Sequence, residues 1–222
     1  MDKVSDLRIY DPRECAVFCK VKERFGECSN MCGGFILLVN GISIRTSEAL
    51  FQALRFTGYP HVQRKIIEQK SPMMAKLVGK PYRKMCNRPD WDEVNIKIMR
   101  WCLRVKLLHN FERFSHVLLE TGDMPIVELS TKSDDFWGTL LVGADEILGM
   151  KIKKKQTRYE VSDMIPAGSL VGYNVMGRLN MELREALKKG VDQMSHDFTR
   201  LEPLDIPDFL LFGESIKEIL RK

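Results

Sequence analysis

The sequence has no long hydrophobic run and no apolar leader. The longest apolar stretches are Phe35–Val39 and Phe209–Phe212, far shorter than the roughly 20 residues that cross a bilayer. Residues 1–11 mix charges with isolated apolar residues and lack the apolar core of a secretory signal. The 222 residues are nevertheless 44% hydrophobic, which is enough to bury a sizeable core. We therefore expect a globular cytoplasmic protein without a membrane partner, with the nucleus as the alternative location.

Cysteine pairs at the usual zinc-ligand spacing are also missing. The six cysteines lie in the first half of the chain, and the closest pairs, Cys15 with Cys19 and Cys28 with Cys32, are four positions apart. Structural zinc sites usually pair their ligands at the shorter C-x2-C spacing. Reduced cysteines that fill small gaps are the better interpretation for an intracellular protein. We expect no metal and no cofactor.

Net positive charge is small outside one segment. The formal charge is +5, and residues 151–158 (KIKKKQTR) alone carry five positive charges. This segment belongs to a stretch from Gly143 to Ser169 that has little helical periodicity, so we expect a loop or a protruding hairpin there. Its cations fit a solvated loop, a phosphate contact or a nuclear import signal, and the sequence leaves these alternatives open.

The middle of the chain has the apolar periodicity of helices. The strongest pattern runs from Trp91 to Leu108, and Asn40–Gly41 favours the two-residue turn of a β-hairpin. Further helices are expected from Thr46–Ser47 and Pro60 and over 72–79, 111–120, 174–189 and 214–220, with a brief strand at 126–129. These elements predict a mainly α, compact single domain over 1–190 with short β-hairpin and strand elements, followed by a C-terminal extension over 191–222.

One short motif combines carboxylates, an indole and a glycine. Asp134–Gly138 has the sequence DDFWG. A flat aromatic ring can stack on a nucleobase, and a carboxylate can stabilise the positive charge that develops on a ribose carbon when an N-glycosidic bond breaks. Aspartate beside an aromatic residue and glycine is also common turn chemistry. The motif therefore supports either a sugar–base site or a structural turn.

The order of several motifs resembles the NADAR family, which is also called YbiA-like. The matching pieces lie within residues 29–184 and are Ser29–Phe35 (SNMCGGF), Thr46–Ala53 (TSEALFQA), Ser71–Lys76 (SPMMAK), Arg88–Trp91 (RPDW), Ile98–Lys106 (IMRWCLRVK), Leu119–Gly122 (LETG), Ile126–Glu128 (IVE), Asp134–Gly138 (DDFWG) and Gly172–Arg184 (GYNVMGRLNMELR). The resemblance implies a YbiA-like, mostly helical fold. It also implies hydrolysis of N-glycosidic bonds.

Family members act on two substrate classes. One class is ADP-ribose attached to guanine in nucleic acid, and the other is the ribosylated aminopyrimidine phosphates of riboflavin biosynthesis. The Ser29–Phe35 and Thr46–Ala53 variants look closer to the guanine-directed branch. We therefore expect an N-glycosidase that removes ADP-ribose from guanine, with the riboflavin intermediates and a non-catalytic ADP-ribose-binding module as alternatives. We expect a monomer whose partner is the modified nucleic acid or an ADP-ribose-like nucleotide.

The resemblance implies three catalytic candidates. Glu48 is the first choice for activating water or assisting the departing base, and Asp134 for binding ribose or stabilising charge, although the reverse allocation is open. Glu48 also suits the first turn of a helix, where the dipole favours a carboxylate. Lys106 either attacks the sugar C1 to form a Schiff base or simply supports a helix C-terminus.

Further residues in or near the matched motifs are expected to bind the substrate. Two amides could hydrogen-bond the ribose, two cations could face a diphosphate, and two indoles could stack on the base, although Trp91 also suits the core of a helix. With two glycines, the substrate-binding candidates are Asn30, Gly33, Lys80, Arg83, Trp91, Trp137, Gly138 and Asn174.

Overall fold

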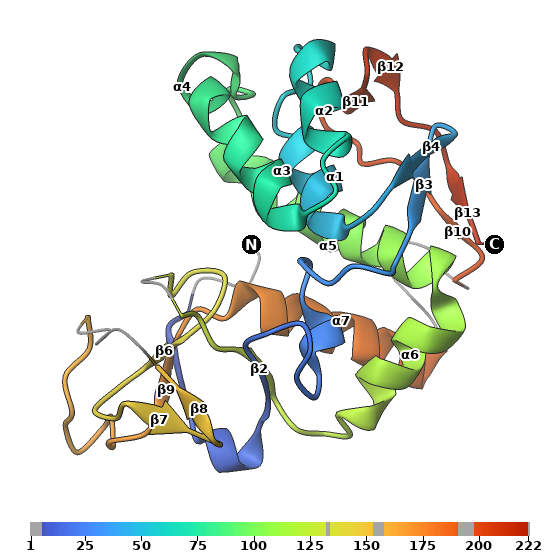
Figure 1. The fold of residues 1–222 in the computed structure, drawn as a ribbon. Coiled ribbons are helices and arrows are strands. Elements are labelled where there is room, and N and C mark those ends of the chain that lie inside the picture. Colours follow the sequence, from blue (N-terminus) through green and yellow to red (C-terminus); the bar gives the residue numbers. More distant parts are fainter. Residues whose placement is uncertain (1–5, 132–133, 153–157, 191–197, 222) are drawn as a thin grey trace. The chain divides into compact units, whose positions relative to one another are not determined.

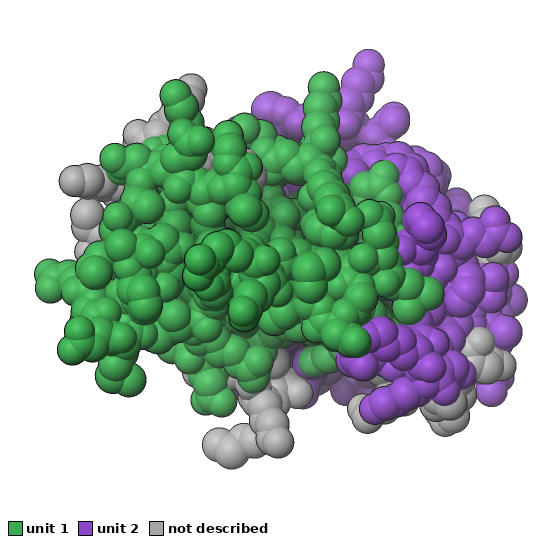
Figure 2. All heavy atoms as spheres, turned by 90° about the horizontal axis from the view of Figure 1, so that it is seen from below, with its two compact units in different colours: residues 1–29, 117–184 green, residues 30–116, 185–222 purple. Residues whose placement is uncertain are grey.

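The computed structural model describes residues 6–131, 134–152, 158–190 and 198–221. The chain divides into two compact units, and each unit combines two separate stretches of sequence (Figure 2). Unit 1 comprises residues 1–29 and 117–184, whereas unit 2 comprises residues 30–116 and 185–222. The motifs that carry the family resemblance are therefore distributed over both units.

Unit 2 is built mainly from helices. Its helical elements are α1 (Ser47–Ala53), α2 (Pro60–Ile67), α3 (Pro72–Gly79), the 3-10 turn η4 (Lys80–Tyr82), α4 (Arg83–Cys86), α5 (Trp91–His109) and the start of α6 (Phe111–Glu120). Figure 1 shows α1, α2 and α3 gathered together, and α1 also packs on α5. The inward faces of these helices form a core in which Leu50, Ile66 and Ile98 are fully buried.

Helix α1 begins as the sequence predicts, and it is buried on all sides. The Thr46 hydroxyl accepts a hydrogen bond from the Ala49 amide at 3.1 Å, which satisfies one of the free donors at the helix start. All seven residues of α1 are buried, and these include Glu48 and Gln52. A short helix with no exposed face can hold polar side chains inside the unit, and this positions the candidate site.

The predicted hairpin at Asn40–Gly41 is confirmed. Strands β3 (Leu37–Val39) and β4 (Ile42–Ile44) pair antiparallel, and the two turn residues have φ angles of 49° and 77°. Positive φ at both positions is what a type I′ turn requires. The Asn40 side chain also accepts from the Lys217 amide and donates to the Ser215 carbonyl, so the turn is tied to the C-terminal segment.

The helix predicted over 214–220 is wrong. Strands β11 (Leu210–Leu211) and β12 (Glu214–Ser215) form a hairpin, and β10 (Arg200–Leu201) pairs with β13 (Ile219–Leu220). Phe212 and Gly213 have φ angles of 57° and 85°, which turn the chain. Pairing with other strands outweighs the weak helical pattern of this short segment.

Unit 1 combines short strands with the last turn of α6 and most of α7 (Val175–Lys189). Strand β9 (Leu170–Gly172) lies between β1 (Arg8–Tyr10) and β6 (Leu140–Leu141) in an antiparallel sheet, and β2 (Ala16–Phe18) pairs in parallel with β5 (Ile126–Glu128). The remaining elements are the 3-10 turns η2 (Pro12–Glu14) and η3 (Gly26–Cys28), the hairpin of β7 (Glu146–Ile147) and β8 (Met150–Lys151), and α7, which belongs to this unit as far as Arg184. The expectation of a mainly α fold therefore describes unit 2 but not unit 1.

The hairpin of β7 and β8 confirms that the stretch from Gly143 to Ser169 is partly hairpin. Most of the predicted lysine cluster, residues 153–157, lies outside the described residues. No helix in the described part of the chain has both the length and the apolar character needed to cross a membrane.

Candidate active site

Glu48 is the centre of a buried polar cluster in unit 2. The side chain has only 3% of its surface exposed. Asn30 Nδ2 donates to Glu48 Oε2 at 2.6 Å, and Gln52 Nε2 donates to Oε1 at 3.0 Å. The Glu48 backbone amide also donates to the Asn30 carbonyl at 3.0 Å. The carboxyl group is therefore held in a fixed orientation by both of its oxygens.

Three cations lie within electrostatic range of this carboxyl group. Arg83 Nη2 donates to Gln52 Oε1 at 3.2 Å, and Lys76 and Arg55 also act on the charge of Glu48. Burial raises the pKa of Glu48 because the charged form loses its solvation, whereas Lys76, the Gln52 hydrogen bond, Arg83 and Arg55 oppose this rise without cancelling it. Glu48 therefore keeps its proton to a higher pH than an exposed glutamate.

Trp91 supports one of these cations. The Arg55 guanidinium lies over the indole ring at 4.1 Å from its centroid, and the Phe51 ring lies 4.9 Å from the same ring. Burial and the nearby Arg83 lower the pKa of Arg55 to about 10, so the group is still charged at neutral pH. Trp91 is 5% exposed, which leaves little of its ring for a stacked base and favours the core interpretation.

Two arginine nitrogens of the cluster lack a partner. Within the described residues, the buried Nε atoms of Arg55 and Arg83 make no hydrogen bond. Buried donors are nearly always satisfied, so these two are exceptions that need a reason. Guanidinium groups pair well with phosphate and carboxylate oxygens. The cluster thus combines a fixed carboxyl group with cationic donors suited to an anionic ligand.

Lys106 is buried between aromatic rings of unit 2. Its Nζ lies 4.0 Å from the ring centroid of Phe114 and 4.3 Å from that of Phe35, and only 1% of the residue is exposed. The face of an aromatic ring attracts an ammonium group. These contacts give Lys106 a packing role in unit 2.

Of the candidates in unit 2, the structure brings Asn30, Glu48, Arg83 and, through Arg55, Trp91 into one cluster. Lys80 and Gly33 are both exposed, and a side chain at Gly33 would meet no atom within 4 Å. These two positions leave room for a ligand but take no part in the hydrogen bonds around Glu48.

The predicted residues of unit 1 form a structural cap. Asp134 Oδ1 accepts from the amides of Phe136 and Trp137 at 3.2 and 3.1 Å, which is the geometry of a turn. The carbonyls of Phe136, Trp137 and Gly138 accept from the amides of Val175, Met176 and Asn174, respectively. Since these amides belong to the first turn of α7, the DDFWG loop satisfies donors that the helix itself cannot.

Asn174 and Gly138 also have tightly defined structural roles. The Asn174 Oδ1 atom accepts from the Glu128 amide at 3.0 Å, and its Nδ2 atom donates to the Ile126 carbonyl and the Tyr10 hydroxyl. A Cβ atom at Gly138 would lie 2.8 Å from the Glu128 carbonyl oxygen, so only glycine fits there. Trp137 is half-buried and packs edge-on against Phe136, with ring centroids 5.4 Å apart.

Three further residues of the Glu48 cluster are not among the candidates predicted from the sequence, namely Gln52, Arg55 and Lys76. Gln52 was detectable, because it lies one helical turn after Glu48 in the same motif. Arg55 follows the end of α1 at seven residues from Glu48, a helical spacing that places both on one side. Lys76 approaches Glu48 only through the packing of α1 and α3, which has no local sequence signal.

Asp135 in unit 1 is also not among the candidates predicted from the sequence, although its carboxylate is paired. Its carboxylate accepts from the Tyr159 hydroxyl and from Arg158, each at 2.6 Å. Burial alone would raise the pKa of Asp135, but these two hydrogen bonds outweigh it and lower the pKa. Arg158 is thus one basic residue of the 151–158 segment with a structural partner.

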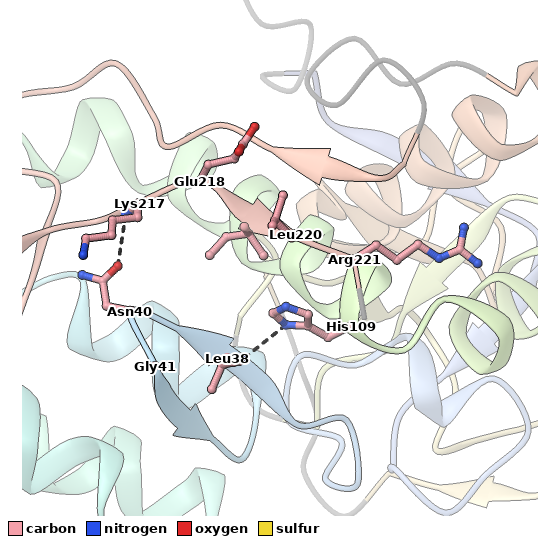
Figure 3. Close-up of a pocket in the computed structure, with 9 residues that line it drawn as sticks. Leu38, Asn40, Gly41, His109, Lys217, Glu218, Leu220 and Arg221 are labelled. Carbon is pink, nitrogen blue, oxygen red and sulfur yellow. Dashed lines mark hydrogen bonds between the residues drawn. The ribbon is translucent and has the colours of Figure 1, made fainter.

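A separate pocket of unit 2 has a volume of about 370 Å³. It is lined by the β3–β4 turn, by His109 at the end of α5 and by residues 217–221 (Figure 3). His109 Nδ1 accepts from the Leu38 amide at 3.1 Å, and Asn40 accepts from the Lys217 amide. None of the predicted site residues lines this pocket.

The fold and the motifs define a known class of protein. The NADAR domain model matches residues 17–188, so the chain belongs to the NADAR family. The NMR structure of the Escherichia coli protein YbiA is similar to this chain, with a TM-score of 0.56 and 27% sequence identity over 78% of this chain and 84% of YbiA. This match confirms the YbiA-like fold.

A riboflavin biosynthesis protein of Vibrio vulnificus is 32% identical to this chain over 102 residues. The match covers 46% of this chain but only 27% of the Vibrio protein, so the chain corresponds to about a quarter of that relative.

Proposed function

We propose that this protein is an N-glycosidase that hydrolyses the bond between a ribose carbon and a base nitrogen in a phosphorylated substrate. The preferred substrate is ADP-ribosylated guanine in nucleic acid. The observation that carries the proposal is the buried Glu48, held by two amides and surrounded by Lys76, Arg55 and Arg83. Membership of the NADAR family supports the same reaction class.

In this proposal Glu48 acts first as a general acid. Its raised pKa favours the protonated carboxyl group, which donates its proton to the base nitrogen as the C1–N bond breaks. The resulting carboxylate then accepts a proton from water as the water oxygen bonds to C1. The proton on Glu48 is thereby restored, and the products are ADP-ribose and the strand with its unmodified guanine. The hydrogen bonds from Asn30 and Gln52 orient both oxygens for these steps.

The cations supply the binding energy for the phosphate groups. Arg55 and Arg83 each have an unsatisfied buried Nε donor, and the three cations exceed the single negative charge that Glu48 can carry. A diphosphate or a phosphomonoester would satisfy these donors and balance the charge. A neutral nucleoside would do neither, so we expect phosphorylated substrates to be strongly preferred.

A second candidate substrate is a ribosylated aminopyrimidine phosphate. The similarity to the Vibrio vulnificus riboflavin biosynthesis protein favours it, because the match covers 102 residues. Such a ribotide has the same chemical elements as the preferred substrate, namely a ribose–nitrogen bond and a phosphate group. The Glu48 cluster suits both.

The test offers the protein an oligonucleotide that carries ADP-ribosylated guanine and, separately, the aminopyrimidine ribotide, and measures product release. We expect release of ADP-ribose from the oligonucleotide, with Glu48→Gln inactive and Glu68→Gln, an exposed control on the same unit, fully active. Selective cleavage of the ribotide would replace the preferred substrate with the second candidate. Tight binding of ADP-ribose without release from either substrate would identify a non-catalytic binding module.

A further inference from the structure

One segment of unit 2 is strongly basic although it contains no run of lysines. Residues 69–89 include Lys70, Lys76, Lys80, Arg83, Lys84 and Arg88 and no aspartate or glutamate. Arg88 is paired with Asp90 at 2.6 Å, but Lys80 and Lys84 are exposed. A face with several cations and no acidic residue of its own segment attracts polyanions.

Aromatic rings lie beside these cations. The ring centroids of Tyr59 and His61 are 6.3 Å apart, and those of His61 and Tyr82 are also 6.3 Å apart, with the rings nearly perpendicular in both pairs. Tyr59 and His61 are exposed, whereas Tyr82 is half-buried. Three rings therefore form a row that joins the start of α2 to η4.

Lys65 connects the ring row to the basic segment. Its Nζ donates to the Tyr82 hydroxyl at 2.8 Å and lies 5.4 Å from the Tyr82 ring centroid. The Tyr59 hydroxyl donates to the Met85 carbonyl at 3.4 Å, which ties the other end of the row to α4. We name Tyr59, His61, Lys65, Tyr82 and Lys84 the aromatic–basic surface.

This surface is linked to the candidate site through a single residue. Arg83 lies between Tyr82 and Lys84 in the sequence, but its guanidinium donates to Gln52, which in turn donates to Glu48. The same short stretch thus presents Tyr82 and Lys84 to the surface and Arg83 to the catalytic cluster. Two hydrogen bonds, from Arg83 to Gln52 and from Gln52 to Glu48, therefore connect this stretch to the candidate site.

We propose that the aromatic–basic surface binds a single-stranded polynucleotide, namely the strand that carries the ADP-ribosylated guanine acted on at Glu48. Alternating aromatic rings and cations are the features that bind single strands without sequence preference, because bases stack on the rings while lysines contact phosphates. The ring row consists of phenol and imidazole rings, which favour bases over lipid chains. The basic segment also exposes Met73, Met74, Leu77 and Met85, so an anionic membrane is the competing ligand that the experiment includes. The role of the strand as substrate rests on the proposed function.

Two variants test the surface by fluorescence anisotropy with a labelled, unmodified single-stranded DNA of mixed sequence. Lys65→Glu with Lys84→Glu should weaken binding at least tenfold and reduce the salt slope of log K by about 1.4, since each phosphate contact on a single strand contributes about 0.7. Tyr59→Ala with His61→Ala should weaken binding about tenfold with little change in salt slope, because stacking is worth about 1–3 kcal/mol per base.

The control has the same charge change at exposed lysines elsewhere. Lys22→Glu with Lys97→Glu should change binding less than twofold. Tyr59→Phe keeps the ring and loses only the hydroxyl, so it should bind like the wild type. Melting curves of every variant separate loss of binding from loss of folding.

Several results would overturn the proposal. Wild-type protein that does not bind the DNA, or surface variants that bind as well as the control, would contradict it. Retention on vesicles of phosphatidylglycerol without DNA binding would assign the surface to a membrane instead. The proposed hydrolysis has an independent readout, because product release from the small ribotide or from free ADP-ribosylated guanosine does not require a strand. Hydrolysis without strand binding refutes only the surface, and strand binding without hydrolysis refutes only the enzyme.

Discussion

The carboxylates of the two units have different kinds of partners. In unit 2, Glu48 accepts hydrogen bonds from two side-chain amides and lies near three cations. In unit 1, Asp134 accepts from the backbone of its own turn, and Asp135 is paired with Arg158 and Tyr159. The bonds of unit 1 account for the fold of its loop. The environment of Glu48 contains unsatisfied arginine donors that the fold alone does not explain.

The DDFWG and SEALFQA motifs both match the family, but one shapes the fold and the other holds a buried carboxyl group. The DDFWG loop caps the first turn of α7, and this requires its backbone shape and the glycine at position 138. The SEALFQA segment buries Glu48, and because burial disfavours the charged form of its carboxyl group, Glu48 costs stability at neutral pH. A buried ionisable group that lowers stability is a better indication of function than residues that only form a turn.

The substitution Asp134→Asn tests whether Asp134 has a role beyond its turn. The amide oxygen of asparagine can still accept from the amides of Phe136 and Trp137, so the turn and the melting temperature should be unchanged. If Asp134 stabilises the ribose charge, as its motif position predicts, kcat should fall about a hundredfold. A kcat within twofold of the wild type would leave Asp134 only its role in the turn. Steady-state kinetics beside a thermal melt make this measurement.

Removal of a cation from the Glu48 cluster should have a smaller effect, which appears in substrate binding. Arg83→Gln removes the charge and one unsatisfied donor, so KM for a phosphorylated substrate should rise about tenfold or more. Arg83→Lys should recover part of the loss, because it restores the charge without the planar donor pair. A KM equal to that of the wild type in both variants would contradict phosphate binding at this position.

Substitution of Lys106 should lower the stability of the protein. Lys106→Ala removes a fully buried side chain and its contacts with Phe35 and Phe114, so the melting temperature should fall by several degrees. Borohydride added during turnover separates packing from catalysis. A trapped sugar adduct on the wild type that is lost in Lys106→Arg would establish the covalent mechanism, whereas no adduct would leave Lys106 as a packing residue.

The smallest effect concerns the pH dependence of stability. Because burial raises the pKa of Glu48, the folded protein holds this proton more tightly than the unfolded chain, in which the pKa of glutamate is about 4.3. The stability of the wild type relative to Glu48→Gln should be fully present below about pH 4.3 and fall as the pH rises through the folded pKa. Urea denaturation of both proteins between about pH 4 and 8 measures the difference. A relative stability that increases with pH would show that the cations outweigh burial.

Local signals predicted much of the fold. Helices α1, α3, α5 and α6 follow from apolar periodicity and caps, and the Asn40–Gly41 turn follows from the backbone preferences of its two residues. Strands β1 and β2 were missed because three residues give no period to detect, and each finds its partner more than a hundred positions away. The false helix at 214–220 has a different cause, since its two-residue strands pair within a local hairpin and with residues 200–201, and two residues show no strand period.

The candidate site was predictable in part for similar reasons. Family motifs identified Asn30 and Glu48, and Arg83 was a candidate between two motifs; the structure joins the three through direct hydrogen bonds and Gln52. Motifs could not separate residues that face a ligand from residues that shape the chain, as Asn174 shows with all of its amide atoms satisfied inside unit 1. That distinction depends on hydrogen-bond partners, which only the folded structure supplies.

The proposal that Glu48 transfers the proton when ADP-ribose leaves the guanine is tested by single-turnover kinetics with Glu48→Gln. The oligonucleotide with ADP-ribosylated guanine is bound in excess enzyme, and both the dissociation constant and the rate of ADP-ribose release are measured. The account predicts a dissociation constant within about threefold of the wild type and a release rate at least about a hundredfold lower. Release at the wild-type rate would contradict it.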